Sequence, residues 1–387
     1  MEEWKTYKLG DLVNLYSGGT PNKSKAGYWG GSIPWISAKS MYEDFLSTSD
    51  LFITESGLKA GSKLAKKDTI LLLTRGSGLF NRIPVCWTER DLAFNQDVKN
   101  IVSKDDSILL NQYLYYWLYG NKAGITAILE TTGIGAGKID TERFLSLDVS
   151  IPSVDEQNRI IRIVEPIFDK IAINNRINHN LEEQAQALYK SWFVDFEPFK
   201  GGKFVDSELG MIPEGWHVGT LSELLEVRYG KDHKALKDGN TPVFGSGGLM
   251  RYAERALYNG ESVLIPRKGT LNNVMYFNGP FWTVDTMFYT VEQSSNVIKY
   301  CHLFLLTQDL ASMNAGSAVP SMTTDILNNL PLLIPSSQVL EAFNRVISSI
   351  YEARSQREEE SNSLSQSRDT ILPQLMSGAL TNTLLTC

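Results

Sequence analysis

Apolar residues recur at helical spacing within residues 151–199. Ile160, Val164, Ile167 and Ile171 follow one another at alternating steps of four and three residues, and the same spacing resumes further along this stretch. Side chains at such steps lie on one face of an α-helix. The pattern therefore predicts a long helix with a single buried stripe.

Individual residues predict where this helix begins and bends. Ser153 followed by Glu156 has the spacing of a capping box, in which the hydroxyl and the carboxylate satisfy free amide groups of the first turn. Pro166 lies inside the apolar pattern, and proline opens a helix more readily than it continues one. We therefore expect a short first helix, a kink near Pro166 and a long run that ends at about Phe193.

A second stretch with the same pattern lies near the C-terminus. A constant shift of 183 in residue number superposes positions 151–152 on positions 334–335 and continues the match through the following helix. In both copies polar residues interrupt the middle of the stripe, and a polar residue in an apolar seam restricts the register of paired helices. We expect the two helices to pair antiparallel, with these polar middles facing each other. The predicted seam comprises Ile167, Ile171, Asn174, Asn178, Leu181, Leu188, Ile350, Arg357, Leu364 and Ile371.

The segments that precede the two helices are also copies of each other. Residues 4–18 match residues 216–230 at a shift of 212, with Trp4 on Trp216 and Gly18 on Gly230. The shift falls to 183 toward the helices, so the first copy contains insertions. We expect an α+β protein with an internal pseudo-two-fold repeat, in which two similar α/β domains are separated by two long antiparallel helices forming a coiled coil.

Short apolar runs predict the elements of each copy. Residues 69–74 and 262–265 are apolar, β-rich and followed by Arg and Gly, as strands that enter turns are. Residues 111–119 and 300–307 are rich in aromatic residues and Leu and favour buried helices. The expected parts of the chain are a first domain at residues 1–152, a first helix at 153–197, a linker and second domain at 198–335, and a second helix with the C-terminal tail at 336–387.

The composition excludes several classes of protein. The chain has 387 residues and a net charge of −7, so it is not a general polycation, and contact with nucleic acid needs local basic patches or a partner. Three scattered cysteines and four histidines give neither a disulfide framework nor a metal-site spacing. Residues 1–10 lack the apolar core of a signal peptide, and no apolar run reaches membrane-spanning length. We expect a cytoplasmic protein without a metal or cofactor.

Two glycine-rich motifs are similar to cofactor loops but do not meet their requirements. The run at residues 133–138 is preceded by Thr132, where a phosphate-binding loop needs its first Gly, and followed by Ile139, where the loop needs a Ser or Thr after its Lys. Residues 244–248 follow no strand-to-helix pattern, and neither Asn-Pro-Pro nor Asp-Pro-Pro occurs in the chain. A Gly-x-Ser-x-Gly nucleophile motif and paired carboxylates are also absent from the sequence. The sequence therefore predicts a non-catalytic protein.

Polar residues follow apolar runs at equivalent places in both copies. Arg75 and Arg267 each come shortly after a predicted strand, where a loop could place the guanidinium beyond the sheet edge. Arg can form two hydrogen bonds with guanine, Asn or Gln can do so with adenine, and Lys or Ser can bind phosphate. An isolated loop arginine is more often only a surface charge, but recurrence with different side chains is typical of two readers of different sequences. The candidate DNA-binding residues are Lys39, Arg75, Ser77, Asn95, Gln96, Lys138, Lys231, Arg267, Lys268, Thr270, Asp285, Thr286, Ser317 and Ser321.

Taken together, the chain resembles the specificity subunits of Type I restriction-modification systems. The resemblance covers essentially the whole chain. It rests on the repeated segments 4–18 and 216–230, on the two helix starts at residues 151–157 and 334–340, and on the motifs at residues 188–196 and 368–378. One departure is Val339-Leu340, which stands where the first copy has Glu156-Gln157.

The resemblance implies two target-recognition domains that each read one part of a bipartite site in double-stranded DNA. It also implies that the paired helices dock two methyltransferase subunits, and that methylation and cleavage reside in the methyltransferase and restriction subunits. About 27 helical residues span roughly 40 Å, close to the roughly 34 to 36 Å of one DNA turn. The alternatives are a specificity subunit of a related DNA methyltransferase without a nuclease, and a scaffold that does not read DNA.

Overall fold

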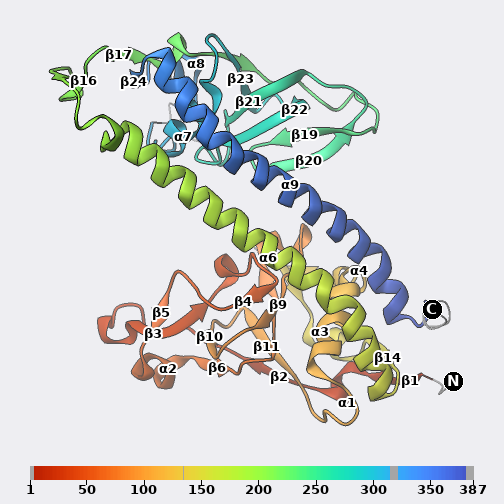
Figure 1. Ribbon diagram of the computed structural model, residues 1–387. Coiled ribbons are helices and arrows are strands. Elements are labelled where there is room, and N and C mark those ends of the chain that lie inside the picture. The colour runs from red at the N-terminus through yellow and green to blue at the C-terminus, as the bar shows by residue number, and fades with distance from the viewer. Residues whose placement is uncertain (1–3, 134, 314–320, 381–387) are drawn as a thin grey trace. The chain divides into compact units, whose positions relative to one another are not determined.

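The computed structural model describes residues 4–133, 135–313 and 321–380 (Figure 1). The chain forms two compact units: unit 1 comprises residues 1–176 and 357–387, and unit 2 comprises residues 177–356. Two long helices, α6 (Val154–Phe193) and α9 (Ser337–Met376), each contribute one segment to each unit. The two helices predicted from periodicity are therefore confirmed.

The start and the middle of α6 differ from the sequence-based expectation. The helix continues through Pro166, so the prediction of two helical segments is wrong. Pro166 is exposed, whereas Val164 and Phe168 on either side of it are buried in the core of unit 1, which holds the helix in place despite the missing hydrogen bond. The predicted capping box is absent from the hydrogen bonds of the described residues, and the Glu156 carboxylate pairs with Arg159 at 3.2 Å.

Gln157 ties the start of α6 to unit 1 instead. Its side chain is fully buried, its Oε1 accepts the Leu110 N–H at 2.9 Å, and its Nε2 donates to the carbonyl oxygens of Ile108 and Pro152. A buried amide with partners on all these sides is held in one orientation. The first turn of α6 is therefore connected to the loop that precedes the aromatic helix of unit 1.

Unit 1 is built from small mixed sheets covered by short helices. The largest sheet has the strand order β2-β11-β7-β9-β4, and a second sheet has the order β5-β3-β10-β6. The strands of these sheets are β2 (Val13–Ser17), β3 (Trp29–Ile36), β4 (Phe45–Leu46), β5 (Phe52–Ile53), β6 (Lys63–Ala65), β7 (Ile70–Leu73), β9 (Val85–Thr88), β10 (Leu92–Phe94) and β11 (Val98–Ser103).

Smaller elements complete unit 1. Strands β12, β13 and β8 form one small sheet, and β1 pairs with β14. The bounds are β1 (Lys5–Lys8), β8 (Arg75–Gly76), β12 (Leu129–Thr131), β13 (Gly137–Ile139), β14 (Asp148–Ile151), α1 (Leu9–Leu12), α2 (Glu55–Gly61), α3 (Asn111–Gly120), α4 (Lys122–Thr126), α5 (Thr141–Leu145), and the 3-10 turns η1 (Ala26–Tyr28), η2 (Ala38–Ser40) and η3 (Ser77–Phe80).

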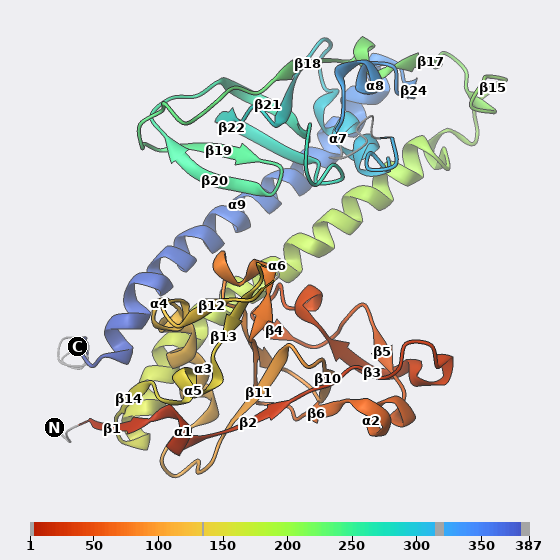
Figure 2. The same ribbon diagram turned by 180° about the vertical axis from the view of Figure 1, so that it is seen from behind.

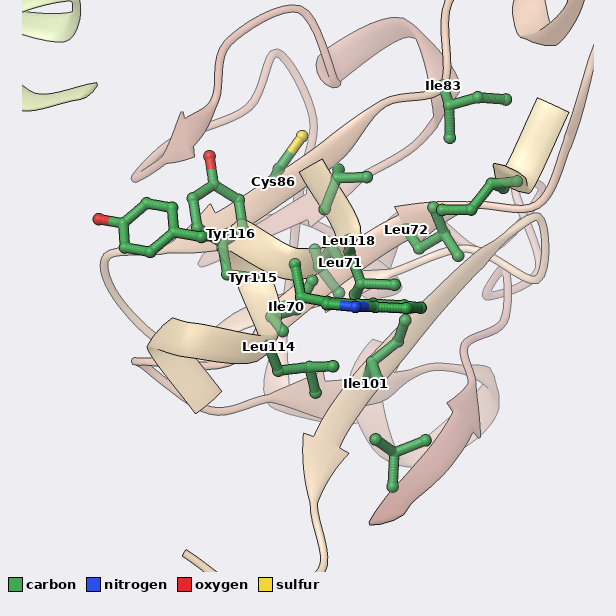
Figure 3. Close-up of a cluster of buried hydrophobic side chains, with 14 of the residues drawn as sticks. Ile70, Leu71, Leu72, Ile83, Cys86, Ile101, Leu114, Tyr115, Tyr116 and Leu118 are labelled. Atoms are coloured by element: carbon green, nitrogen blue, oxygen red, sulfur yellow. The ribbon is translucent and has the colours of Figure 1, made fainter. Parts of the chain in front are cut away.

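The core of unit 1 lies between the central sheet and α3. All four residues of β7 are buried, and Leu114 and Leu118 of α3 lie in the same cluster of buried side chains (Figure 3), while Tyr115 and Tyr116 stack on Phe168 of α6. This confirms the predicted strand and the predicted aromatic helix. Burying aliphatic and aromatic side chains together supplies the main stabilising free energy of such a unit.

Unit 2 has one larger sheet with the order β18-β23-β21-β22-β19-β20, whose strands lie side by side in Figure 2. Its strands are β18 (Leu225–Tyr229), β19 (Thr241–Gly245), β20 (Gly248–Ala253), β21 (Tyr258–Pro266), β22 (Met275–Thr283) and β23 (Met287–Glu292). The remaining elements are β15 (Phe204–Val205), β16 (Ile212–Pro213), β17 (His217–Thr220), β24 (Pro331–Ile334), α7 (Ile298–Leu306), α8 (Thr324–Asn328), η4 (Glu197–Phe199) and η5 (Leu221–Glu223).

The two units repeat one topology. The order β2-β11-β7-β9 in unit 1 corresponds to β18-β23-β21-β22 in unit 2. The strand pair β1 and β14 joins Lys5 to Ile151, and the pair β17 and β24 joins His217 to Ile334, so shifts of 212 and 183 relate both partners. The shift of 183 also relates both the first and the last positions of α5 to those of α8. The predicted internal repeat is therefore confirmed.

Within each unit the segments of α6 and α9 run antiparallel. In unit 1, Arg368 lies over the ring of Phe168 at 5.2 Å, and Asn174 donates to Glu360 at 2.8 Å. In unit 2, the rings of Phe193 and Phe343 are 4.7 Å apart, and Asn178 donates to the Arg354 carbonyl oxygen. As the numbers rise along α6 they fall along α9, as an antiparallel pair requires.

Candidate nucleic-acid interface

The candidate residues of unit 1 gather where several strands end. The Thr74 N–H donates to the Asp97 carbonyl oxygen at 2.8 Å, and the Asn95 N–H donates to the Ile36 carbonyl oxygen at 2.9 Å. These bonds join the ends of β7, β10 and β3, and η2 with the exposed Lys39 follows β3 directly. The candidates that reach the surface, together with Lys99, form the unit 1 cluster: Lys39, Arg75, Ser77, Gln96, Lys99 and Lys138.

Arg75 and Lys138 are paired in this cluster. They are cross-strand partners on the antiparallel strands β8 and β13. Arg75 is exposed, Lys138 is partly buried, and Glu130 on β12 lies on the other side of Lys138. Directly opposed residues of an antiparallel pair have neighbouring side chains. Two cationic groups therefore share one face of this small sheet.

Lys99 is a member that the sequence analysis missed. It lies on β11 opposite Ser17, and its ammonium donates to the Ser17 hydroxyl. Burial lowers the pKa of Lys99, and the neighbouring positive charges of Arg75 and Lys63 lower it further. The sequence could have indicated Lys99, because it lies at an outward position of the strand that follows Asn95 and Gln96. Lys99 lies near both Arg75 and Lys63. The Lys63 ammonium is 5.9 Å from the centre of the exposed Tyr16 ring.

Asn95 is not available for reading bases, contrary to the sequence-based expectation. It is 6% exposed, and its Oδ1 accepts the N–H groups of Asp97 and Val98 at 3.0 and 3.1 Å. Asn side chains frequently make such turns with the backbone that follows. The neighbouring Gln96 is exposed, and its Oε1 accepts the Thr20 hydroxyl at 2.8 Å. Asn95 therefore shapes the loop that presents Gln96.

The candidate residues of unit 2 gather at the equivalent strand ends. The N–H groups of Arg267 and Lys268 both donate to the Thr286 carbonyl oxygen, at 2.9 and 3.2 Å, and the Lys231 N–H donates to the Thr283 carbonyl oxygen at 2.9 Å. A β-bridge joins Lys268 to Ser321. The unit 2 cluster comprises Lys231, Arg267, Lys268, Thr270, Asp285, Thr286 and Ser321, whereas the candidate Ser317 lies outside the described residues.

Arg267 is oriented by two contacts. Its guanidinium lies over the ring of Tyr229 at 5.3 Å, and its Nη1 donates to the Asp285 carbonyl oxygen at 3.3 Å. Tyr229 is 52% exposed and also packs edge-on against Phe288. Cation–π stacking holds a guanidinium while leaving its other N–H groups free to bond. Tyr229 was missed by the sequence analysis, although it directly precedes Gly230 of the detected repeat.

The structure pairs the residues of the two clusters differently from the sequence. Arg75, which the sequence pairs with Arg267, corresponds in the structure to the next residue, Lys268. The Thr74 and Arg267 N–H groups make equivalent bonds, to Asp97 and Thr286, so the counterpart of Arg75 is Lys268. In the same way Asp97 corresponds to Thr286, so the counterpart of Gln96 is Asp285. The ladder partners agree, because the shift of 183 relates Lys138 to Ser321. The same framework thus presents Arg and Lys in unit 1, and Lys and Ser in unit 2.

Glycine is required where the first strand of each cluster ends. A Cβ at Gly18 would overlap the carbonyl oxygen of Phe94, and a Cβ at Gly230 would overlap that of Val284. Both glycines let neighbouring backbones approach closely. The aromatic side chains at the end of α6 have a structural role, since Trp192 and Phe193 both stack on Phe343.

Metal sites and membrane-spanning helices are both absent from the described ranges. Among these residues, no three His, Cys, Asp or Glu side chains are grouped so as to hold a metal ion. None of the helices in the same ranges combines the length and the apolar character that a membrane span needs.

The chain is similar to one protein family over most of its length. Residues 1–183 and 213–359 match the family described as Type I restriction modification DNA specificity domain. The chain is 27% identical to the Type I restriction enzyme MjaIX specificity subunit of Methanocaldococcus jannaschii, over 98% of this chain and 94% of that protein. It is 31% identical to the EcoR124I/EcoR124II specificity subunit of Escherichia coli, over 49% of this chain and 46% of that protein.

A solved structure has the same fold. The S subunit of a Type I restriction-modification system from M. genitalium matches with a TM-score of 0.57 and 17% identity, and 96% of each chain is covered. At this level of identity the match concerns the fold alone. It includes both units and both long helices, since nearly the whole chain is covered.

Proposed function

Because the chain belongs to the family of the Type I restriction modification DNA specificity domain, we propose that it reads a bipartite sequence in double-stranded DNA, with one half-site for each unit. Within such restriction-modification complexes the specificity subunit recognises DNA, and methylation and cleavage are carried out by other subunits. The supporting observation is that one strand framework presents different side chains in the two clusters. Arg75 faces Lys138 in unit 1, whereas Lys268 faces Ser321 in unit 2.

The chemistry of the clusters fits base edges and phosphates. Arg267 is held by stacking on Tyr229, and a planar guanidinium can bind guanine through two hydrogen bonds. Gln96 is exposed and has the groups that bind adenine in the same way. The lysines of both clusters are suited to phosphate contacts, which position the protein without reading sequence. Each half-site is therefore read by a mixture of polar base contacts and phosphate contacts.

Partner subunits complete this function. Two methyltransferase subunits bind α6 and α9, and restriction subunits join the complex in the cytoplasm. The net charge of −7 is consistent with partners that supply part of the positive field toward DNA.

The decisive experiment exchanges one domain in the assembled complex. The chain is co-expressed with its methyltransferase subunits, the modified bases are mapped, and residues 1–152 are then replaced by the corresponding segment of a related specificity subunit. We expect one half of the modified sequence to change and the other half to stay the same. A change in both halves, or in neither half while the complex still assembles, would contradict the assignment of one half-site to each unit.

A point variant tests the unit 2 cluster separately. Arg267→Ala should relax or abolish recognition of one half-site and leave binding of the methyltransferase subunits unchanged. Lys237→Ala is the matched control, because Lys237 is exposed in the same unit near the far end of β20, where its carbonyl oxygen accepts the Glu254 N–H. If Arg267→Ala instead prevents assembly of the complex, Arg267 does not act as a base reader.

A further inference from the structure

Strands β19 and β20 of unit 2 form a hairpin with an unusual surface. Three apolar or aromatic side chains of β20 are exposed: Leu249 at 47%, Met250 at 56% and Tyr252 at 41%. Single exposed apolar residues are ordinary, but consecutive exposed Leu and Met at the start of an edge strand are not needed for any buried face. The hairpin therefore has surface that its own fold does not use.

A β-bulge in the hairpin leaves Met250 exposed. Val243 pairs with Arg251 and Phe244 pairs with Leu249, so Met250 is an extra residue in a β-bulge. Gly245 faces it across the hairpin and has no side chain, which leaves room for the Met250 thioether beside the strand. Bulges commonly redirect a side chain at a functional surface. Leu249 and Met250 are thus presented next to each other just after the Ser246–Gly247 turn.

This end of the hairpin adjoins the unit 2 cluster. Asn273 Nδ2 donates to the Ser246 carbonyl oxygen at 2.8 Å, and a Cβ at Gly269 would lie 2.8 Å from Ser246 Oγ. On the other side, the Val284 N–H donates to the Phe244 carbonyl oxygen at 3.0 Å. Gly269 follows Lys268, and Val284 precedes Asp285. The apolar pair is therefore continuous with the loops that present Arg267, Lys268 and Asp285.

The edge of β20 is not open for pairing with a strand of another protein. Arg251 Nη2 donates to the Leu236 carbonyl oxygen at 2.8 Å and also binds Asp238 at 3.1 Å. The Glu254 N–H donates to the Lys237 carbonyl oxygen at 3.0 Å. Residues 236–238 thus cover the far half of the edge, and the bulge at Met250 interrupts the near half. A ligand of this surface must meet its side chains and not its backbone.

We propose that Leu249 and Met250 enter the DNA major groove and contact 5-methyl groups of thymine in the half-site read by unit 2. This inference rests on the proposed function. A two-stranded β-ribbon fits the major groove, and apolar side chains recognise thymine there through its methyl group. Met is flexible and adapts to the position of such a group. The neighbouring Arg267, Lys268 and Lys231 supply the positive charge that a purely apolar protein partner would not require.

The test removes the methyl groups one at a time. In the complete complex with methyltransferase subunits, each thymine of the unit 2 half-site is replaced by deoxyuridine and the dissociation constant is measured. For the unaltered protein we expect a three- to fivefold weaker affinity at one or two of these positions, the effect of losing one buried methyl contact. For Leu249→Ala combined with Met250→Ala, affinity for the thymine-containing DNA should fall by a similar or greater factor, and the deoxyuridine substitutions should have no further effect.

Two control variants, Met211→Ala and Arg267→Ala, separate the outcomes. Met211→Ala removes a methionine that is 55% exposed elsewhere in the same unit and should leave both affinities unchanged. If the deoxyuridine effects persist in the double variant, or if neither change alters affinity, the methyl assignment is overturned. If Arg267→Ala also leaves recognition of this half-site unaltered, the proposed DNA-reading function of unit 2 fails. If Arg267→Ala alters recognition and the hairpin variant does not, only the present inference fails.

Discussion

Arg75 lies directly opposite Lys138 across strands β8 and β13, so two cationic side chains are cross-strand neighbours. Like charges in this position destabilise an antiparallel pair, and the lowered pKa of Lys99 nearby reflects burial together with the repulsion from Arg75 and Lys63. Glu130 is the cross-strand partner of Lys138 on its other side, but its carboxylate pairs with Arg143 at 3.9 Å. The arrangement is most favourable when a polyanion lies across the cluster.

The variant Lys138→Ser introduces into unit 1 the arrangement that unit 2 has at Ser321. Loss of repulsion from Arg75 and loss of attraction to Glu130 oppose each other, so the free energy of unfolding should change by less than about 1 kcal/mol. The dependence of DNA affinity on salt should weaken, with the logarithmic slope reduced by about 0.9, as expected for one lost phosphate contact. Affinity is measured for the assembled complex at several salt concentrations. An unchanged slope would mean that Lys138 does not meet phosphate.

Gly18 and Gly230 follow the first strand of each cluster, and we expect alanine at either position to destabilise the protein for the same steric reason. Gly18→Ala and Gly230→Ala each place a methyl group against a backbone carbonyl oxygen, so each should lower the free energy of unfolding by about 1 to 3 kcal/mol or more. Gly27→Ala and Gly201→Ala serve as controls, because a Cβ at either position meets no atom within 4 Å. Chemical denaturation measures all four variants. Equal stability of Gly230→Ala and Gly201→Ala would show that the backbone at Val284 moves to accommodate a methyl group at position 230.

His302 makes the stability of unit 2 dependent on pH. It is buried, its Nδ1 is 2.6 Å from the Tyr351 hydroxyl, and burial, together with the charge of Arg354, lowers its pKa to about 3. The unfolded chain takes up a proton near pH 6.5, whereas the folded protein does so only near pH 3. The free energy of unfolding should therefore fall as the pH falls through this range, by about 2 kcal/mol between pH 7.5 and pH 5.

The variant His302→Asn isolates this contribution. It should be less stable than the original protein at pH 7.5, because the bond to Tyr351 is altered, but its stability should depend less steeply on pH between 7.5 and 5. His179→Asn is the control, since His179 is exposed on α6 in the same unit. Urea denaturation at both pH values gives the comparison. Parallel pH profiles for all three proteins would refute the assignment to His302.

Asn174 predicts how the helix pair responds to charge. The residue is fully buried, its Nδ2 donates to Glu360 at 2.8 Å, and Lys170 binds the same carboxylate at 3.2 Å. Asn174→Asp places a second carboxylate there and should lower the free energy of unfolding at pH 7 by about 3 to 5 kcal/mol. The loss should diminish as the pH is lowered, because protonation removes the repulsion.

Asn174→Leu is the companion variant. It removes the buried Oδ1, which has no hydrogen-bond partner, together with the Nδ2 bond to the exposed Glu360. These two effects oppose each other, so the free energy of unfolding should stay within about 1 kcal/mol of the original value. Thermal unfolding of both variants at pH 5 and pH 7 supplies the data. If Asn174→Leu is as harmful as Asn174→Asp, packing and not charge governs this position. The predicted role of the whole seam in fixing register stays a prediction.

Periodicity and internal repeats predicted most of the fold. The shifts of 212 and 183 relate the strand partners Lys5 and Ile151 to His217 and Ile334, and the long helices lie where the apolar stripes placed them. These features depend on burial, which repeats along the chain with the period of each element. The continuity of α6 through Pro166 could not be predicted, because it depends on packing on both sides of the proline.

The clusters were predicted less completely than the fold. Sequence indicated the loops, but the hydrogen bonds of the strand ends decide which residue of each loop reaches the surface. Asn95 turns inward to bind backbone N–H groups and Gln96 turns outward, although both have the same chemistry. Lys99 and Tyr229 lie on strands and joined the clusters only once cross-strand neighbours were known.

The pairing of β1 with β14, and of β17 with β24, has an evolutionary consequence. Each pair joins the first strand of a domain to the strand that leads directly into a long helix. The chain between the two paired strands therefore forms a closed loop. Because the cost of closing a loop rises only slowly with its length, insertions and deletions inside it leave the start of the helix undisturbed. The greater length of the first copy is an instance. New DNA specificities can therefore arise by lengthening, shortening or recombining these loops, while the starts of both long helices stay in place.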